Sequence, residues 1–198
     1  MHSREISPLG PVLFYLNSQS FTIHGLWPTV KTTKKYGAFD LSIIEANQTL
    51  YADMQNFWPP QSLPNHTPTN LWAHEWGKHG GDYAELLLRV RPDEFKGLSG
   101  DKLNKALQFA FFRDTIAFYK SFRATYRYPS SQLTKDSFAH LFGIQADQVT
   151  FSCVRGFTVR EVKICFDLNK VGFTVKRCPK QENTGCKKGT NFELPGWR

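Results

Sequence analysis

Apolar residues along the chain follow two kinds of repeat, one typical of strands and one typical of helices. Short β-branched and aromatic runs at residues 11–16 and 21–27 are bounded by turn-forming residues, and we interpret both as strands. Near the C-terminus, apolar residues alternate along 159–166 and again along 171–175. This pattern predicts two antiparallel strands joined at residues 169–170.

Between these strands the apolar spacing changes to that of helices, which we predict over residues 41–57, 69–90, 101–122 and 134–142. Thr69 or Asn70 can cap the second of these helices, because a side-chain oxygen there accepts an orphan amide hydrogen. We expect Gly80-Gly81 to interrupt the same helix. Helices in the middle of the chain with strands at both ends predict an α+β fold.

Length and charge narrow the class of protein. A chain of 198 residues suits one domain spanning residues 1–198. The hydrophobic fraction of 40% is too high for a disordered chain, and no apolar run approaches the ~20 residues that span a bilayer. A net charge of +8 with 15% aromatic residues is compatible with a polyanionic partner such as nucleic acid. The first residues lack the pattern of a secretory signal.

All four cysteines lie in the last quarter of the chain: Cys153, Cys165, Cys178 and Cys186. An even number in one segment indicates a disulfide framework and an oxidising compartment, with reduced thiols as the alternative. The residues alone leave all three pairings open. A zinc site is disfavoured because no C-x-x-C pair occurs. Asn47 and Asn65 each begin a glycosylation sequon.

Residues suited to catalysis cluster in two segments. His24 lies in the first, a predicted strand, and the second is a predicted helix that carries His74, Glu75, Lys78 and His79. At about 100° per residue, these four side chains fit on one helix face. One face would then carry two imidazoles, a carboxylate and an ammonium group. We interpret the other histidines, His2, His66 and His140, as solvated or satisfied within the core.

Acid–base phosphoryl chemistry fits this set better than metal or nucleophile chemistry. A zinc motif needs histidines four residues apart, whereas His74 and His79 are five apart with the cation of Lys78 between them. No Gly-x-Ser-x-Gly motif occurs. RNA supplies its own nucleophile, the 2′-hydroxyl, so one imidazole can accept its proton while another protonates the leaving 5′-oxygen. Such a site needs no metal and no cofactor.

Two long motifs surround these residues. Residues 21–28, Phe-Thr-Ile-His-Gly-Leu-Trp-Pro, and residues 72–80, Trp-Ala-His-Glu-Trp-Gly-Lys-His-Gly, resemble the two active-site segments of the ribonuclease T2 family. The C-terminal cysteine pattern is also similar, and the resemblance covers roughly residues 12 to 195. It implies an α+β fold with a central antiparallel sheet and several packed helices. It also implies cleavage of single-stranded RNA through a 2′,3′-cyclic phosphate.

The resemblance implies a role for each matching residue. His24 and His79 would be the acid and the base, His74 would contact phosphate, and Glu75 and Lys78 would stabilise the transition state. Trp27 would stack on a base, as aromatic side chains do in single-strand recognition, and Trp72 would also bind substrate. The disulfides would pair Cys153 with Cys186 and Cys165 with Cys178.

The chain departs from the family pattern beside the second motif. The family usually continues Gly-Thr-Cys, whereas this chain has Gly80-Gly81-Asp82, and no cysteine occurs over residues 29–60 to form the corresponding disulfide. We expect the charge of Asp82 to raise the pKa of His79. Thr29 stands where an Asp often aids base recognition, and Leu71 replaces a common aromatic residue.

Two other functions stay open at this point. A T2-fold protein that no longer cuts RNA would act as an RNA-binding or structural subunit of a larger assembly, using its basic surface. A basic RNA-binding module outside the family is a third reading, although the chain shows no RNA-recognition motif. The family default for location is secreted or vacuolar/lysosomal. The absence of a signal pattern leaves an organelle or the cytosol as alternatives.

Overall fold

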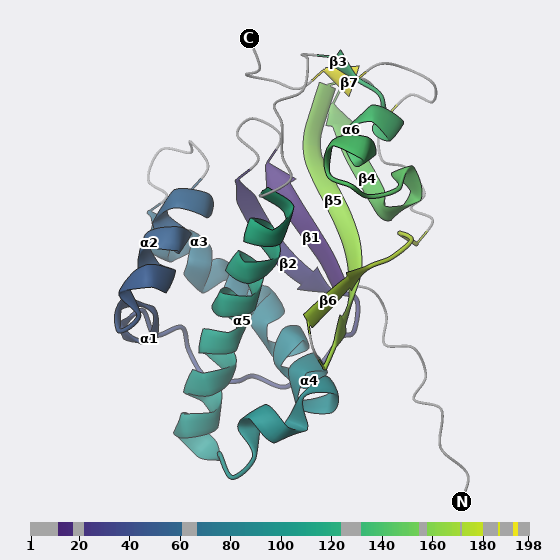
Figure 1. The fold of residues 1–198 in the computed structure, drawn as a ribbon. Coiled ribbons are helices and arrows are strands. Elements are labelled where there is room, and N and C mark those ends of the chain that lie inside the picture. The colour runs from purple at the N-terminus through teal and green to yellow at the C-terminus, as the bar shows by residue number, and fades with distance from the viewer. Residues whose placement is uncertain are drawn as a thin grey trace, which may run out of the picture.

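Strands from both ends of the chain meet in one sheet, and helices from the middle of the chain pack against it (Figure 1). The computed structural model describes residues 12–17, 22–60, 67–123, 132–154, 158–170, 172–179, 186 and 192–193. This arrangement is the α+β fold that the order of elements predicts.

The sheet is built around β5 (Thr158–Asn169), the longest strand. Strands β1 (Val12–Asn17), β4 (Val149–Val154) and β6 (Gly172–Val175) each pair antiparallel with β5, and β2 (Ile23–Pro28) pairs antiparallel with β1. Strand β7 (Phe192–Glu193) pairs parallel with β5 at one position and antiparallel with β3 (Gln132–Leu133). The sheet is therefore antiparallel throughout except at β7.

The predicted strands are present, with small changes of boundary. β5 and β6 form the expected hairpin, in which Asn169 pairs with Gly172. The first predicted strand corresponds to β1, and the second corresponds to β2, which ends at Pro28. Pro11 and Phe21 lie outside the described residues. Because β1 lies between β2 and β5, the first motif is placed close to the C-terminal half of the chain.

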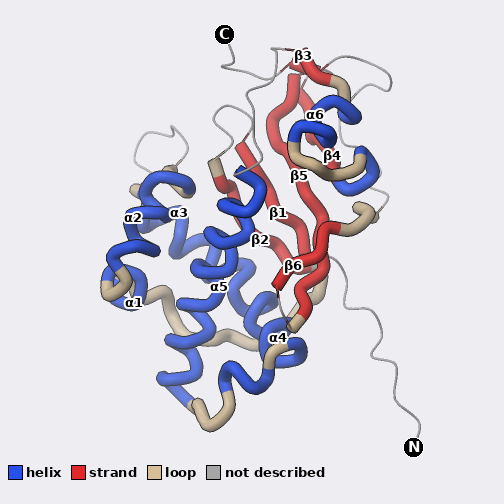
Figure 2. The backbone as a smooth tube through the Cα atoms, in the orientation of Figure 1, coloured by secondary structure: helices blue, strands red, loops and turns tan. Residues whose placement is uncertain are grey.

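In the ranges that the structure describes, five α-helices group on one side of the sheet and a sixth lies apart beside β4 (Figure 2). The α-helices are α1 (Ser42–Glu45), α2 (Gln48–Phe57), α3 (Pro68–Glu75), α4 (Gly81–Val90), α5 (Gly100–Arg123) and α6 (Lys135–Leu141). Shorter turns of other helix types are η1 (Trp76–Gly80), η2 (Pro92–Phe95) and η3 (Ala146–Gln148). None of the helices in the described ranges has the length and hydropathy of a membrane span.

Side-chain caps start three of the helices. The Asn47 side chain accepts a hydrogen bond from the amide of Leu50 at the start of α2. Thr67, rather than Thr69 or Asn70, caps α3, and Pro68 occupies the first helical position. The expected cap was wrong because proline fits the first turn, where its missing N–H leaves no hydrogen bond unmade. Thr134 caps α6.

The expected interruption at Gly80-Gly81 is also wrong. Both glycines have right-handed helical dihedral angles, so the chain is helical from α3 through η1 into α4. The glycines are needed for close packing instead. A Cβ atom on Gly80 would lie 2.1 Å from the Trp76 ring, and one on Gly81 would lie 2.7 Å from the carbonyl oxygen of Lys34.

The segment that carries the second motif contains a π-helical turn. Residues Trp76–Gly80 form η1, in which backbone hydrogen bonds join residues five positions apart instead of four. The Trp76 side chain is buried, and its Nε1 donates a hydrogen bond to the carbonyl oxygen of Gly37, 3.2 Å away. The regular spacing of 100° per residue therefore does not hold across this segment.

Aromatic side chains fill the core behind the first motif. Trp58, Trp72, Phe111 and Phe112 are each at most 1% exposed. Trp72 Nε1 donates to the carbonyl oxygen of Trp58, 2.9 Å away, and Trp58 Nε1 donates to the carbonyl oxygen of His24, 3.0 Å away. Two buried indoles thus connect α3 to α2 and α2 to strand β2. They fix the backbone at His24.

Both disulfides that the resemblance implied are present. Cys153 is bonded to Cys186 and Cys165 is bonded to Cys178, with Cα–Cα distances of 4.9 and 5.2 Å. These distances lie in the usual range for disulfides. The alternative of four reduced thiols does not describe this structure.

Replacement of Gly81 by alanine tests the close packing of the helix on residues 31–36. We expect Gly81→Ala to destabilise the protein by ~1–3 kcal/mol, because the new methyl group must displace the Lys34 backbone. Gly77→Ala is the matched control, since it lies in the same helix and its Cβ would meet nothing within 4 Å.

Thermal unfolding measures both variants, with a shift of about 2–4 °C expected per kcal/mol for a chain of this size. Gly77→Ala should leave the melting temperature unchanged or raise it, since alanine is the better helix former. Equal melting temperatures for the two variants would show that the contact at Gly81 does not matter.

Candidate active site

Trp27 lies between the two histidines that the motifs supply. Its indole stacks on the imidazole of His79, with ring centres 4.8 Å apart and planes 18° apart. The His24 ring meets the same indole edge-on at 5.2 Å. The Lys78 ammonium lies 5.9 Å from the centre of the Trp27 ring, a cation–π contact. Residues from both motifs therefore converge on one aromatic side chain.

Glu75 is fixed under this indole by a hydrogen bond. Trp27 Nε1 donates to Glu75 Oε2 at 2.8 Å, and Glu75 is only 1% exposed. Burial raises the pKa of the Glu75 carboxyl above its ordinary value, although the Trp27 bond and the charges of His24 and Lys78 oppose the rise. A Cβ on Gly25 would lie 2.1 Å from Glu75 Oε2, so the glycine of the first motif gives this carboxyl its space.

His79 is buried beside Trp27 and is poised in its neutral form. It is 6% exposed, and within the described part of the chain neither ring nitrogen has a hydrogen-bond partner. Burial, reinforced by the charges of Lys31 and Lys78, lowers the pKa of His79 to about 4. The expectation that Asp82 raises the pKa of His79 was wrong for the net pKa. The carboxylate does act in that direction, but burial and the two lysines lower the pKa by more.

His24 has a partner that lies outside both motifs. Its Nδ1 lies 2.8 Å from Oε1 of Glu161, which comes from strand β5, 137 residues away along the chain. Burial alone would raise the pKa of Glu161, but the hydrogen bond and charge of His24 hold it below its ordinary value. A weak sequence signal existed: Glu161 interrupts the apolar alternation of a predicted strand between Val159 and Val162.

The other three predicted residues lie in different surroundings. His74 and Lys78 are exposed, unlike Glu75 and His79, so the four residues do not share one exposed helix face. Trp72, expected to bind substrate, is 1% exposed and belongs to the core. Its indole N–H is used by the Trp58 carbonyl oxygen, and its side chain offers no surface to a substrate.

Two acidic side chains join α4 to residues 31–36. One of them, Asp82, stands where the second motif of the family usually continues with a cysteine. The buried Asp82 accepts hydrogen bonds from the backbone N–H of Thr32 at 2.9 Å and from Lys31 Nζ at 3.0 Å. One turn later, Glu85 forms an ion pair with Lys34 at 2.7 Å and accepts a hydrogen bond from the Tyr36 hydroxyl. We refer to the contacts of Asp82 and Glu85 with residues 31–36 as the acidic clamp.

The arrangement suits acid–base chemistry on a phosphodiester. One imidazole is neutral over most of the pH range, the other is held by a carboxylate, and the charged Lys78 lies at the rim. Neutral and protonated imidazoles in one site can accept one proton and donate another. In the residues that the structure describes, no group of three or more His, Cys, Asp or Glu side chains is placed to hold a metal ion.

Comparison with known proteins decides the family. The model of the ribonuclease T2 family matches residues 9–178, which include both motifs and three of the four cysteines. The chain belongs to the ribonuclease T2 family.

Individual members of the family align with different lengths of this chain. Ribonuclease T2 of Sus scrofa is 32% identical over 108 residues, which are 50% of this chain and 52% of the relative. Ribonuclease 3 of Arabidopsis thaliana is 39% identical over 87 residues, 36% of this chain and 37% of the relative. This chain therefore spans about half the length, or less, of these two family members. Ribonuclease DdI of Dictyostelium discoideum is 27% identical over 88% of this chain and 73% of its own length.

Solved structures of the family support the fold. The crystal structure of Actibind, a T2 ribonuclease, is 21% identical and superposes with a TM-score of 0.62, covering 96% of this chain and 89% of that one. An RNase-related protein from Calystegia sepium is 18% identical and has a TM-score of 0.63, covering 96% and 98%. At these identities the likeness establishes the T2 fold and not an activity.

Removal of the Asp82 carboxylate tests the acidic clamp. Asp82→Ala leaves the Thr32 amide without its acceptor, so we expect a loss of ~1–3 kcal/mol in the free energy of unfolding. Asp93→Ala is the control, because Asp93 is an exposed acidic residue in η2, outside the clamp. Thermal unfolding with and without a thiol reductant provides the measurement.

The reductant distinguishes the contribution of the acidic clamp to stability from the contribution of the two disulfides. It should lower the melting temperature of wild type and both variants by similar amounts, while the gap between Asp82→Ala and wild type persists. A clamp without structural importance would leave Asp82→Ala as stable as Asp93→Ala.

Proposed function

We propose that this protein is an endoribonuclease that cleaves single-stranded RNA without a metal, through a 2′,3′-cyclic phosphate. The observation that carries the proposal is the convergence of His24 and His79 on Trp27, with one ring neutral and the other paired to a carboxylate. Membership of the ribonuclease T2 family supports the same reaction class.

In the proposed reaction His79 is the general base. The neutral ring accepts the proton of the 2′-hydroxyl, and the 2′-oxygen attacks the adjacent phosphorus. Burial and nearby cations keep the ring unprotonated and ready to accept. Both ring nitrogens are buried and have no hydrogen-bond partner in the described part of the protein, so substrate binding must expose one of them.

His24 is the general acid in this scheme. The bond between phosphorus and the 5′-oxygen breaks, and the protonated His24 donates its proton to that departing oxygen. Because the Glu161 contact uses Nδ1, the donated proton leaves from Nε2. Lys78 stabilises the charge that gathers on the phosphate oxygens, and the exposed His74 contacts phosphate. The buried Glu75 contributes to transition-state stabilisation by holding Trp27 through its hydrogen bond.

Recognition of the RNA and the place of action follow from the same features. We assign base stacking to Trp27, which is partly exposed at the rim of the site. The net charge of +8 attracts the polyanionic substrate. The two disulfides fit an oxidising compartment, such as a secreted or vacuolar/lysosomal location.

Cleavage of single-stranded RNA in the presence of EDTA tests the activity. We expect wild type to release products that end in a 2′,3′-cyclic phosphate, and to leave single-stranded DNA intact because DNA lacks the 2′-hydroxyl. His24→Ala and His79→Ala should each lower kcat by about 10²–10⁴-fold, the usual contribution of a general acid or base. His140→Ala is the control, since His140 is exposed on α6.

The outcome also distinguishes the alternative function. RNA that is bound but left uncut from mildly acidic to neutral pH would identify the chain as a silent T2-fold binding subunit. Turnover of DNA, or loss of activity in EDTA, would contradict the mechanism.

The pH dependence of kcat/KM tests the role of His79. The base works only when unprotonated, and its pKa is about 4, so the acidic limb of the profile should be half-maximal near pH 4. Lys31→Met removes one of the cations that lower this pKa, and it should shift the limb to higher pH. A limb near the ordinary histidine value of about 6.5 in both proteins would exclude His79 as the base.

A further inference from the structure

We propose that Glu161 is a positioning residue for His24, which fixes the orientation and tautomer of the catalytic acid. The proposal rests on the ribonuclease reaction described above and extends it to a residue on another strand. Neither motif contains Glu161, and 137 residues separate it from His24 in the sequence. The order of three strands, β2, β1 and β5, brings the two side chains together.

The contact between the two side chains is short and sheltered. His24 Nδ1 and Glu161 Oε1 are 2.8 Å apart, and Glu161 is 8% exposed. The side chain of His24 is 27% exposed, so its ring reaches the surface while the partner carboxylate stays inside. A substrate can therefore reach the imidazole but not the carboxylate. This arrangement suits a carboxylate whose task is to orient the imidazole.

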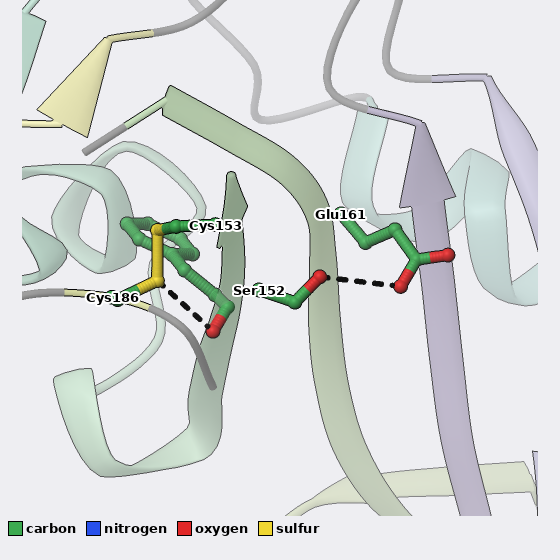
Figure 3. Close-up of a disulfide and its surroundings, with 5 residues drawn as sticks. Ser152, Cys153, Glu161 and Cys186 are labelled. Atoms are coloured by element: carbon green, nitrogen blue, oxygen red, sulfur yellow. Dashed lines mark hydrogen bonds between the residues drawn. A yellow bond between two sulfur atoms is a disulfide. The ribbon is translucent and has the colours of Figure 1, made fainter. Parts of the chain in front are cut away.

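Glu161 is itself held by groups on two strands. Ser152 on β4 donates its hydroxyl to Glu161 Oε2 at 3.3 Å, and Figure 3 shows this contact beside the Cys153–Cys186 disulfide. Arg160 on β5 lies 3.8 Å from the same oxygen. Both carboxylate oxygens therefore have partners, which limits rotation of the side chain.

The charges around this pair favour the ionised carboxylate. His24 on β2 and both Arg160 and Lys163 on β5 lower the pKa of Glu161, and together they outweigh its burial. Glu75, which lies on α3 in the second motif, also interacts electrostatically with the Glu161 carboxylate. An ionised carboxylate only accepts hydrogen bonds, so it requires a proton on Nδ1 of His24.

A fixed proton on Nδ1 has a direct chemical consequence. The proton that the imidazolium gives up must then be the one on Nε2, the nitrogen that faces the leaving oxygen in the proposed reaction. After donation, the neutral ring keeps its Nδ1–H and its bond to Glu161. Glu161 acts through His24 and touches no substrate atom itself.

The test compares two substrates that differ only in their leaving group. A dinucleoside phosphate needs the acid to protonate its departing 5′-oxygen, whereas a nucleoside 3′-(4-nitrophenyl phosphate) has a leaving group that departs without protonation. For Glu161→Gln we expect kcat to fall at least about tenfold on the dinucleotide, with little change in KM, because a general acid contributes about 10²–10⁴-fold. On the nitrophenyl ester the loss should be less than about threefold.

Two further comparisons make the result specific. Glu94→Gln is the matched control, because Glu94 is an exposed carboxylate paired with Arg91 and Arg113 away from this site. It should match wild type on both substrates. In a His24→Ala background, Glu161→Gln should cause no further loss on the dinucleotide. If Glu161→Gln does not fold, Ser152→Ala removes one contact to the carboxylate and should show the same substrate dependence with a smaller loss.

The outcomes separate this proposal from the function on which it rests. Wild-type cleavage with equal losses on both substrates, or with no loss in Glu161→Gln, would overturn the positioning role and leave the ribonuclease function standing. A further loss in the His24→Ala background would also overturn it. A wild-type protein that cleaves neither substrate would overturn both.

Discussion

The hydrogen bond from Trp27 Nε1 to Glu75 joins the end of strand β2 to helix α3, and the other site residues are placed by it. With the indole in this orientation, one face receives the ring of His79 and an edge meets His24. The Cys165–Cys178 disulfide packs against the same indole. A residue for which we propose base stacking is thus also in contact with both histidines, the proposed acid and the proposed base.

Much of the fold and most of the site could be predicted from local patterns. Periods of two and 3.6 residues indicated the strands and the long helices, since these repeats reflect which side chains face the core. The residues of the two motifs were named from their sequence context. The disulfide pairing came from the resemblance to the family, because spacing alone left three pairings open.

The features that sequence reasoning missed depend on contacts between distant segments. Glu161 meets His24 across strand β1, and neither residue's neighbours in sequence point to the other. Gly80-Gly81 was interpreted as a break because glycine disfavours helices, yet tertiary contacts with Trp76 and Lys34 require its small size. Trp72 stands inside the second motif but packs in the core, so membership of a motif did not distinguish structural support from substrate contact.

The π turn makes the length of the second motif a constraint, apart from the identity of its residues. A π turn spans one residue more than an α turn, so deletion of one residue between Glu75 and Asp82 would restore regular α-helix. The rest of α4 would keep roughly its present orientation relative to α3, because the extra residue of a π turn is absorbed locally. The change would fall on the turn itself, which carries Lys78 and His79. The extra residue therefore shapes the site directly, rather than the direction in which the chain continues into α4.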